Sequence, residues 1–279
     1  MSAINELKEI LEQTQTASFV TTMLRDISAT KLQSIRAAFD ANQTYFLELH
    51  GLMALVELYQ ERYLQAHKKH EEKKRVYIAI TSNKRFYGTL NHQIIHELHM
   101  SYAKDSEADC IVVGQTGRQI LETSDLSIPA SFALFATDEP APAEIFAFLQ
   151  GLTEYTEILV IHPTFVSSFI QQAMITDITH VPDIAHITQT PELDYLFEPE
   201  IPEMIQFFKT QVRLVLFARV VLETQLALTG ARLMKMQRAR ERAEELLKQQ
   251  RRTIHKEIST IQSMLLLEAF AGFRSKDTL

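Results

Sequence analysis

Residues 222–265 decide the fold of this chain, and they read LETQLALTGARLMKMQRARERAEELLKQQRRTIHKEISTIQSML. Spacings of four and three residues connect the members of one seam, which is the repeat of a helix packed along a partner helix. A continuous helix from about Arg213 to Phe270 would be roughly 85 Å long at 1.5 Å per residue, too long for the interior of a compact domain. The seam, with one slip near Ile258, consists of Leu222, Leu226, Thr229, Leu233, Met236, Arg240, Ala243, Leu247, Gln250, Ile254, Ile258, Ile261 and Leu265.

The distribution of proline extends the helix prediction to both ends of the chain. All eight prolines lie between Pro129 and Pro202, so residues 1–75 and 203–279 lack the strongest helix breaker. The N-terminal segment repeats the same spacing more faintly, which suits a helix packed along a partner or enclosed by other subunits. Its seam runs through Leu7, Ile10 or Leu11, Thr14, Ala17, Thr21, Leu24, Ser28, Lys31, Ile35, Ala38 and Asn42.

The middle of the chain has a different pattern. Short β-branched runs at residues 75–81 (RVYIAIT), 109–113 (DCIVV) and 157–161 (EILVI) predict strands, and residues 91–104, 117–123 and 164–174 predict helices after them. Residues 176–187 leave room for a further strand or two. This alternation predicts a Rossmann-like α/β domain with a largely parallel sheet. We therefore expect three regions: an N-terminal coiled-coil helix at 1–74, a globular α/β domain at 75–202, and a C-terminal coiled-coil helix at 203–279.

Charge divides the chain along similar lines. Residues 119–208 contain 14 acidic residues and no lysine or arginine, whereas residues 209–279 contain 14 basic and 7 acidic residues. Such asymmetry indicates faces that meet different partners. The single cysteine, Cys110, excludes an internal disulfide and fits a reducing compartment. The N-terminus lacks a signal-peptide pattern, and Arg213 and Arg219 interrupt the most apolar C-terminal run, so we expect a soluble intracellular protein without a membrane span.

Several segments resemble one known family in the same order along the chain. Residues 81–91 (TSNKRFYGTLN) match its signature at Thr81, Ser82, Gly88 and Asn91, and residues 112–119 (VVGQTGRQ) and 195–200 (YLFEPE) are similar to later family segments. At the C-terminus, residues 227–243 (ALTGARLMKMQRARERA) and 254–262 (IHKEISTIQ) resemble its longest helix. Further matching positions are Thr21, Arg25, Lys31, Leu32, Ala231, Arg232, Met236, Ala239, Ala243, Glu257 and Ile258.

The family is the gamma subunit of F-type rotary ATP synthases, and the resemblance covers essentially the full length. The chain departs from it in several places. About two helical turns are absent between Ala243 and Ile254, and Thr22 stands where a basic residue is usual. In the signature segment the usual Asp, Arg, Gly and Cys are replaced, as is a second glycine. The replacing residues are Asn83, Lys84, Arg85, Tyr87 and Thr89. These departures indicate a divergent or alternative member.

The resemblance implies a rotor without an active site of its own. In that family the terminal helices form a left-handed antiparallel coiled coil inside a ring of three alpha and three beta subunits. The globular part contacts the epsilon subunit and the membrane rotor ring, peripheral to the cytoplasmic side of the bacterial inner membrane. No cofactor, metal or nucleic acid is implied. The candidate contacts with the hexamer are Arg25, Lys31, Arg232, Lys235, Met236, Arg240, Ile258, Ile261 and Leu265, and the signature loop contributes Thr81, Ser82, Gly88 and Asn91.

Two surfaces carry functional hypotheses. The first is a basic stretch with nine positive and three acidic residues between Arg232 and Lys256, which would face acidic loops of the catalytic beta subunits. A solvated helix face is the alternative. The second is the apolar C-terminal tip, which would sit in an apolar sleeve of the hexamer. The alternative is that the tip packs back on the globular part. The tip consists of Ile258, Ile261, Met264, Leu265, Leu266, Leu267 and Phe270.

Other functions have weaker sequence support. His92, His96 and His99 have helical spacing that would allow a zinc site, but surface histidines explain them as well. Gly114 and Gly117 follow a strand as in a phosphate loop, yet neither GxGxxG nor GK[ST] is present. A coiled-coil scaffold or nucleic-acid-binding rod would use the basic C-terminal helix, although the acidic middle region and the lack of interleaved aromatic residues argue against nucleic acid.

Overall fold

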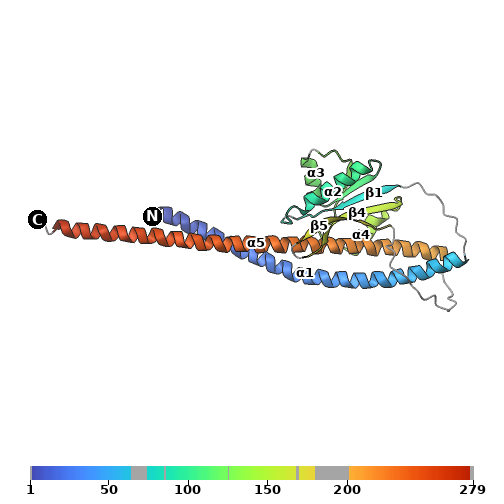
Figure 1. Cartoon of the computed structure of the whole chain (residues 1–279), viewed down its shortest axis with the longest axis horizontal. Helices are drawn as coiled ribbons and strands as arrows, with labels where there is room; N and C mark the ends of the chain where they lie inside the picture. Colours follow the sequence, from blue (N-terminus) through green and yellow to red (C-terminus); the bar gives the residue numbers. More distant parts are fainter. Residues whose placement is uncertain are drawn as a thin grey trace. The chain divides into compact units, whose positions relative to one another are not determined.

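The computed structural model describes residues 2–63, 74–84, 86–124, 126–167, 170–179 and 201–276. Across these residues the chain forms five helices and five strands (Figure 1). Two of the helices are very long, α1 with 62 residues and α5 with 76. In chain order the elements are α1 (Ser2–Tyr63), β1 (Arg75–Ile80), α2 (Leu90–Lys104), β2 (Asp109–Val113), α3 (Gln115–Thr123), β3 (Ala130–Ala133), α4 (Pro142–Gln150), β4 (Glu157–Phe165), β5 (Gln171–Asp177) and α5 (Ile201–Lys276).

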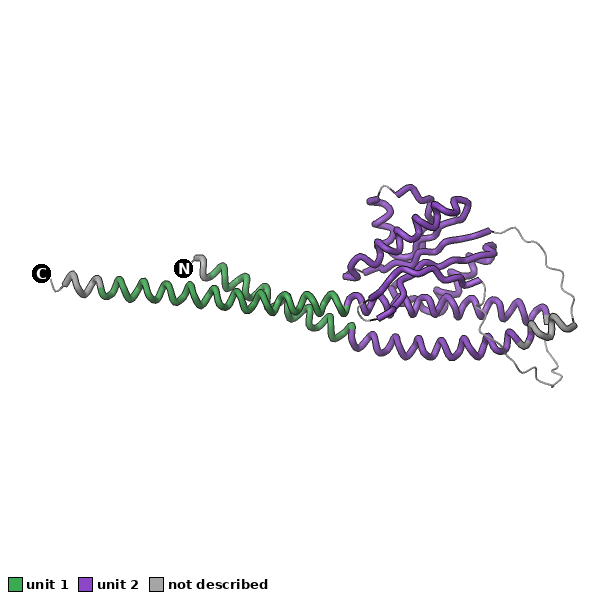
Figure 2. Tube along the Cα trace, viewed as in Figure 1, with its two compact units in different colours: residues 1–28, 233–279 green, residues 29–232 purple. Residues whose placement is uncertain are grey.

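Contacts divide the chain into two compact units, coloured separately in Figure 2. The two-helix unit contains residues 1–28 and 233–279, and the sheet unit contains residues 29–232. Both α1 and α5 continue through both units, so each long helix serves one unit with one part of its length and the other unit with the rest.

Five strands form the sheet of the sheet unit in the order β3-β2-β1-β4-β5. The first four are parallel, with Ile78 of β1 opposite Ile111 of β2 and Val160 of β4, whereas β5 is antiparallel to β4. The predicted fold class, long terminal helices in an antiparallel pair together with a central Rossmann-like α/β domain, is confirmed.

Both faces of the sheet are covered. Successive residues of β1 alternate between them: Ile78 belongs to the apolar core on the α5 side, and Tyr77 and Ala79 belong to the core on the α2 and α3 side. The α5 side is the larger core and includes α4 and the sheet-unit part of α1, with Phe46 and Phe217 almost completely buried. Because this part of α5 lies between the sheet and α1, most of its surface is expected to be apolar.

This burial explains the apolar character of α5. Among the described residues, one helix, within Pro202–Phe270, is long and apolar enough by composition to cross a membrane, and 67% of its most apolar window is buried in the structure. The sequence expectation did not anticipate that any helix would meet this criterion. The burial is what the core helix of a folded domain shows.

One predicted helix is wrong. Residues 164–165 end β4 and residues 171–174 begin β5, and between these strands Ser167 Oγ accepts a hydrogen bond from Ile170 N at 3.1 Å. Val166, Ile170 and Met174 recur every four residues, which resembles a helical face, but all three are exposed. Pairing of every residue of β5 with β4 outweighs that local pattern.

Two elements were not predicted, and some boundaries differ. Strand β3 has only four residues, and α4 begins at Pro142, where a proline is compatible with a first helical turn. The C-terminal helix begins at Ile201, earlier than expected from its seam. The possible strand at 176–187 is present only as the end of β5 at Asp177. Residues 180–187, like the family segment at 195–200 and Arg85, lie outside the described residues.

Helix α5 approaches β4 very closely at one point. A Cβ atom on Gly230 would lie 2.8 Å from the ring of Phe165, closer than side chains tolerate. The guanidinium of Arg36 on α1 also lies 5.8 Å from the centroid of the Phe165 ring. Glycine at position 230 is thus required by the packing of the helix on the strand.

A buried polar group lies between α5 and the sheet. His162 on β4 is completely buried, and its Nε2 lies 2.9 Å from Thr176 Oγ1. Thr164 Oγ1 donates a hydrogen bond to Glu223 on α5. Burial lowers the pKa of His162 below its usual value, and the nearby Glu223 carboxylate opposes this shift in part.

The buried histidine predicts a pH-dependent stability. Because the folded state lowers the pKa of His162, the unfolded state binds the proton more readily, and stability should fall as the pH drops below about 6.5. We expect His162→Gln to reduce the loss of melting temperature between about pH 7.5 and pH 5.5. His96→Gln, at an exposed position on α2, is the matched control and should retain the wild-type dependence. Equal pH dependence in His162→Gln and wild type would contradict this prediction.

Candidate functional site

The family-like signature loop lies at the carboxyl ends of β1 and β2. Thr81 Oγ1 donates a hydrogen bond to Val113 O at 2.7 Å and accepts one from Gly117 N at 3.0 Å. Asn91, at the start of α2, accepts a hydrogen bond from Ser82 N at 3.2 Å and donates one to Ser82 Oγ at 2.8 Å. Three of the four predicted signature residues therefore form one buried network that joins β1, α2 and α3.

The first amides of α3 are all occupied by this loop. Gln115 N donates to Asn83 Oδ1 at 2.9 Å, Thr116 N donates to Ser82 O at 3.0 Å, and Gly117 N donates to Thr81 Oγ1. A phosphate loop needs such amides free to bind an anion. The phosphate-loop alternative is therefore wrong for this helix.

The two glycines of that alternative have a structural explanation. Gly114 has φ of 103°, and a Cβ there would lie 2.4 Å from Thr81 O. A Cβ on Gly117 would lie 2.5 Å from Thr81 Oγ1 and 2.8 Å from Val112 Cγ1. The space beside them, at the strand ends where Rossmann-like folds often bind ligands, is a cavity of only about 20 Å³ that Val221, Thr224 and Leu228 of α5 help to close.

Beyond the signature residues, the loop places Tyr87 against α5. The flanking residues Phe86 and Gly88 have positive φ angles of 77° and 69°. This conformation suits glycine, but it is strained for phenylalanine, at a cost of about 1–2 kcal/mol. It turns the Tyr87 side chain inward, where it is buried with Leu90, Leu228 and Ala231.

Tyr87, Asp138 and Arg232 together form what we call the Tyr87 cluster. Arg232 Nη2 on α5 donates a hydrogen bond to Tyr87 Oη at 2.5 Å, and the guanidinium carbon lies 4.5 Å from the ring centroid. Tyr87 Oη donates to Asp138 Oδ2 at 3.3 Å. Burial raises the pKa of Tyr87 to about 12, so the phenol keeps the proton that this donation requires.

A second ion pair lies close to the Tyr87 cluster. Lys31 on α1 bonds to the carboxylate of Glu139, the residue after Asp138. Partial burial lowers the pKa of Lys31, and the positive charges of Lys84 and Arg232 lower it further. Two predicted contacts with a partner, Lys31 and Arg232, are thus engaged within the sheet unit.

In the two-helix unit the predicted C-terminal seam lies between the helices. Met236, Ala243 and Ile254 are buried, and the seam members Ile258 and Ile261 are half-buried. Its polar members also face the partner helix: Gln250 Nε2 donates to Thr14 Oγ1 at 3.2 Å. The buried Met236 side chain contributes to this packing and offers no surface to another subunit.

The N-terminal seam follows the predicted spacing with two local shifts. The residues at 7, 11, 14, 21, 24, 28, 31, 35 and 42 are all at least partly buried. Ala17 and Ala38 are exposed, and the neighbouring Ser18 and Phe39 take the less exposed positions.

The remaining contact candidates have accessible surface. Arg25 forms an ion pair with the adjacent Asp26 at 2.5 Å, and Arg240 forms one with Glu244 at 2.7 Å. Lys235 is exposed. Leu265 belongs to the apolar tip, where Met264, Leu265, Leu266, Leu267 and Phe270 are each 59–70% exposed. Within the two-helix unit no described residue covers these five side chains.

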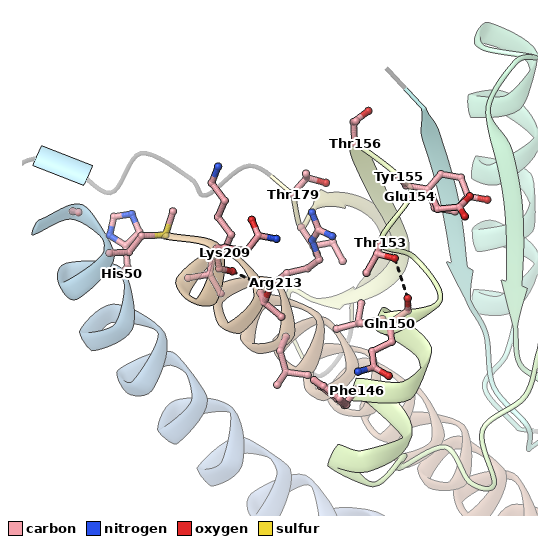
Figure 3. A pocket seen from close by; sticks show the side chains of 18 residues that line it. His50, Phe146, Gln150, Thr153, Glu154, Tyr155, Thr156, Thr179, Lys209 and Arg213 are labelled. Atoms are coloured by element: carbon pink, nitrogen blue, oxygen red, sulfur yellow. Dashed lines mark hydrogen bonds between the residues drawn. The ribbon is translucent and has the colours of Figure 1, made fainter. Parts of the chain in front are cut away.

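A cleft of the sheet unit lies near the opposite ends of the strands (Figure 3). It has a volume of about 880 Å³ and is bounded by α1, α4, α5 and the segments that flank β4 and β5. Lys209 and Arg213 project from α5, and Glu154 and Tyr155 lie across the opening. Glu154 is paired with Lys74 and Tyr155 with Asp109, so these side chains serve the fold.

The histidines on α2 gain no support as a metal site. His92 and His96 are exposed on that helix. Within the described ranges, no group of three His, Cys, Asp or Glu side chains lies close enough to hold a metal ion.

Comparison with known proteins identifies the family. A model for the ATP synthase gamma subunit matches residues 3–257, nearly the whole chain. The chain belongs to the ATP synthase gamma-subunit family. One relative, the ATP synthase gamma chain of Xanthomonas campestris pv. campestris (strain B100), is 23% identical over 262 residues, covering 88% of this chain and 90% of the relative.

Solved structures agree on the gamma-family fold. A chain of the Euglena gracilis mitochondrial ATP synthase superimposes with a TM-score of 0.64 and 12% identity, over 98% of this chain and 94% of that one. A chain of the Tetrahymena thermophila mitochondrial ATP synthase central stalk and c-ring structure gives a TM-score of 0.59 and 16% identity, over 79% of this chain and 99% of that one.

Sequence reasoning noted Tyr87 only as a departure from the gamma-family signature and missed Asp138 and Glu139. Both acids lie in residues 119–208, a region with 14 acidic residues and no lysine or arginine. The sequence pattern does not distinguish one carboxylate of this region from another. Their partners lie far away in sequence, at Tyr87, Lys31 and Asn83. Only the tertiary structure distinguishes these two from the other carboxylates.

The close packing around Gly117 predicts that alanine at this position lowers stability, whereas alanine at a glycine with open space around it does not. Gly117→Ala should lower the free energy of unfolding by about 1–3 kcal/mol, because its Cβ would overlap Thr81 and Val112. Gly51→Ala in α1 is the control: no atom lies within 4 Å of its added Cβ, so stability should rise by about 0.5–1 kcal/mol. Urea unfolding measures both. A Gly117→Ala variant as stable as wild type would refute this account of the glycine.

Proposed function

We propose that this chain is the central-stalk rotor subunit of an F-type ATP synthase or ATPase. It couples ion flow through a membrane ring to ATP synthesis or hydrolysis in an alpha/beta hexamer by rotating, and it has no active site of its own. The observation that carries this proposal is the 76-residue helix α5, which is a core element of the sheet unit and continues through the two-helix unit without a break. After Pro202 in its first turn, α5 contains no further proline, and a continuous helix without a proline kink is suited to transmit rotation.

The exposed positive charge of the two-helix unit supports contact with acidic surfaces of other subunits. Seven basic residues between positions 235 and 256 are exposed, and among the described residues none of them has an ion pair: Lys235, Arg238, Arg242, Lys248, Arg251, Arg252 and Lys256. We propose that they meet acidic loops of the beta subunits. Exposed pairs contribute only about 0–1 kcal/mol each, so such contacts form and release as the rod turns.

The apolar tip supports an enclosed shaft end. Five large apolar side chains at 59–70% exposure leave a surface that water solvates poorly. We propose that an apolar sleeve of the hexamer surrounds the tip, because hydrophobic contacts are non-directional and permit turning. The other proposed partners are an epsilon subunit and the membrane ring, which place the chain at the cytoplasmic side of a bacterial inner membrane.

The rotor proposal predicts that the tagged chain co-purifies with a hexameric ATPase. Recovery of the chain alone, or with nucleic acid, would favour the scaffold or nucleic-acid alternative and contradict the rotor.

The tip gives a sharper test of the same complex. Truncation after Ser259 should weaken co-purification, and so should the full-length variant with Leu265, Leu266 and Leu267 all changed to Gln. The second variant keeps the helix length, and since these side chains are exposed in the free chain, its melting temperature should match wild type. Undiminished recovery of the hexamer with both variants would exclude the sleeve.

A further inference from the structure

We infer that the Tyr87 cluster is the joint through which torque passes between helix α5 and the sheet unit, an inference that rests on the proposed rotor function. The three side chains come from three separate segments: Tyr87 from the loop after β1, Asp138 from the segment after β3, and Arg232 from α5. Arg232 is also the last residue of the sheet unit along α5. The helix is therefore tied to the sheet unit at the point where it leaves it.

The cluster connects Arg232 to the sheet by an unbroken series of hydrogen bonds. Asp138 accepts from Tyr87 Oη through Oδ2 and from Asn83 N through Oδ1 at 2.6 Å. Asn83 in turn donates through Nδ2 to Phe135 O at 3.3 Å and accepts from Gln115 N at the start of α3. Force on α5 thus reaches the ends of β1 and β3 and the start of α3.

This connection differs in kind from the other contacts of α5 with the sheet. Those contacts are mainly apolar, and they favour burial without a preferred direction. A charge-assisted hydrogen bond with a ring stacked beside it has a defined geometry and resists rotation of the helix about its own axis. Tyr87 is only 7% exposed among Leu90, Leu228 and Ala231, so water competes little for this bond.

The nearby ion pair extends the joint to α1. Lys31 and Glu139 tie the first long helix to the same segment that carries Asp138. Their side chains are 35% and 51% exposed, so this pair is weaker than the buried bond of Arg232. We therefore assign the main role to Tyr87 and Arg232. In this inference Arg232 acts inside the chain.

The test removes the hydroxyl group of Tyr87 and compares the effect with that of removing the hydroxyl group of another tyrosine. Tyr87→Phe keeps the ring over Arg232 but deletes the bonds to Arg232 and Asp138. Tyr155→Phe is the control, because Tyr155 Oη also donates to an aspartate at 2.8 Å, but that aspartate, Asp109, lies on β2 and the bond does not involve α5. Melting temperatures of both full-length variants establish that they fold.

Two measurements follow on the wild type and both variants. In the full-length chain alone, Tyr87→Phe should speed amide hydrogen exchange at residues 226–232 by about tenfold, the factor expected when one charge-assisted hydrogen bond is lost. In the reconstituted complex, Tyr87→Phe should lower the number of ions pumped per ATP hydrolysed. Tyr155→Phe should leave both measurements at the wild-type level.

A double-variant comparison tests whether the two residues act as one. If Tyr87 and Arg232 act through their shared bond, Arg232→Gln combined with Tyr87→Phe should lower coupling no further than Arg232→Gln alone. Additive losses would show separate roles and overturn the joint.

The remaining outcomes separate this inference from the proposed function. Wild-type coupling in Tyr87→Phe, whether or not exchange increases, would overturn the torque role while leaving the rotor assignment intact. A parallel fall in hydrolysis and pumping, with their ratio unchanged, would also overturn it. Failure of the wild-type chain to associate with a hexamer would instead remove the rotor proposal itself.

Discussion

The burial of α5 is the constraint on which the rest of the structure depends. The helix has to satisfy two environments in sequence: first a sheet on one side and α1 on the other, and then a single partner helix. From Val212 to Ala231 most residues are buried, whereas beyond Leu233 the buried positions narrow to a seam. The change from a broad apolar surface to a narrow one occurs without proline or a break, so a single helix belongs to both units.

Much of this arrangement could be predicted from the sequence because the decisive signals are periodic. The seam from Leu233 to Ile261 contains no fully exposed position, and the strands at 75–81, 109–113 and 157–161 occur where β-branched runs predicted them. The failure at 164–174 has a physical cause. A four-residue recurrence of Val166, Ile170 and Met174 satisfies a helix locally, but the long strand β4 offers β5 a complete ladder of hydrogen bonds.

The candidate site could be predicted less well than the fold. Sequence resemblance located the signature loop, and the structure places Thr81, Ser82 and Asn91 in one network. The sequence resemblance did not show that Lys31 and Arg232 each bind another side chain within the sheet unit. Both are basic residues in segments whose net charge is positive or close to zero. Their partners, Glu139 and Tyr87, lie 108 and 145 positions away in the sequence. Long-range polar pairing leaves no periodic trace, so only tertiary structure separates an internal cation from one offered to a partner.

The close approach at Gly230 has a consequence for motion along the helix. The Phe165 ring occupies the space that a side chain at position 230 would need, and Leu228 and Thr229 precede this position. If α5 moved along its own axis, a residue with a Cβ atom would take the place of Gly230 beside the ring and would overlap it. The glycine therefore fixes the axial register of the helix against β4. Sliding of α5 along the sheet is blocked at this one position.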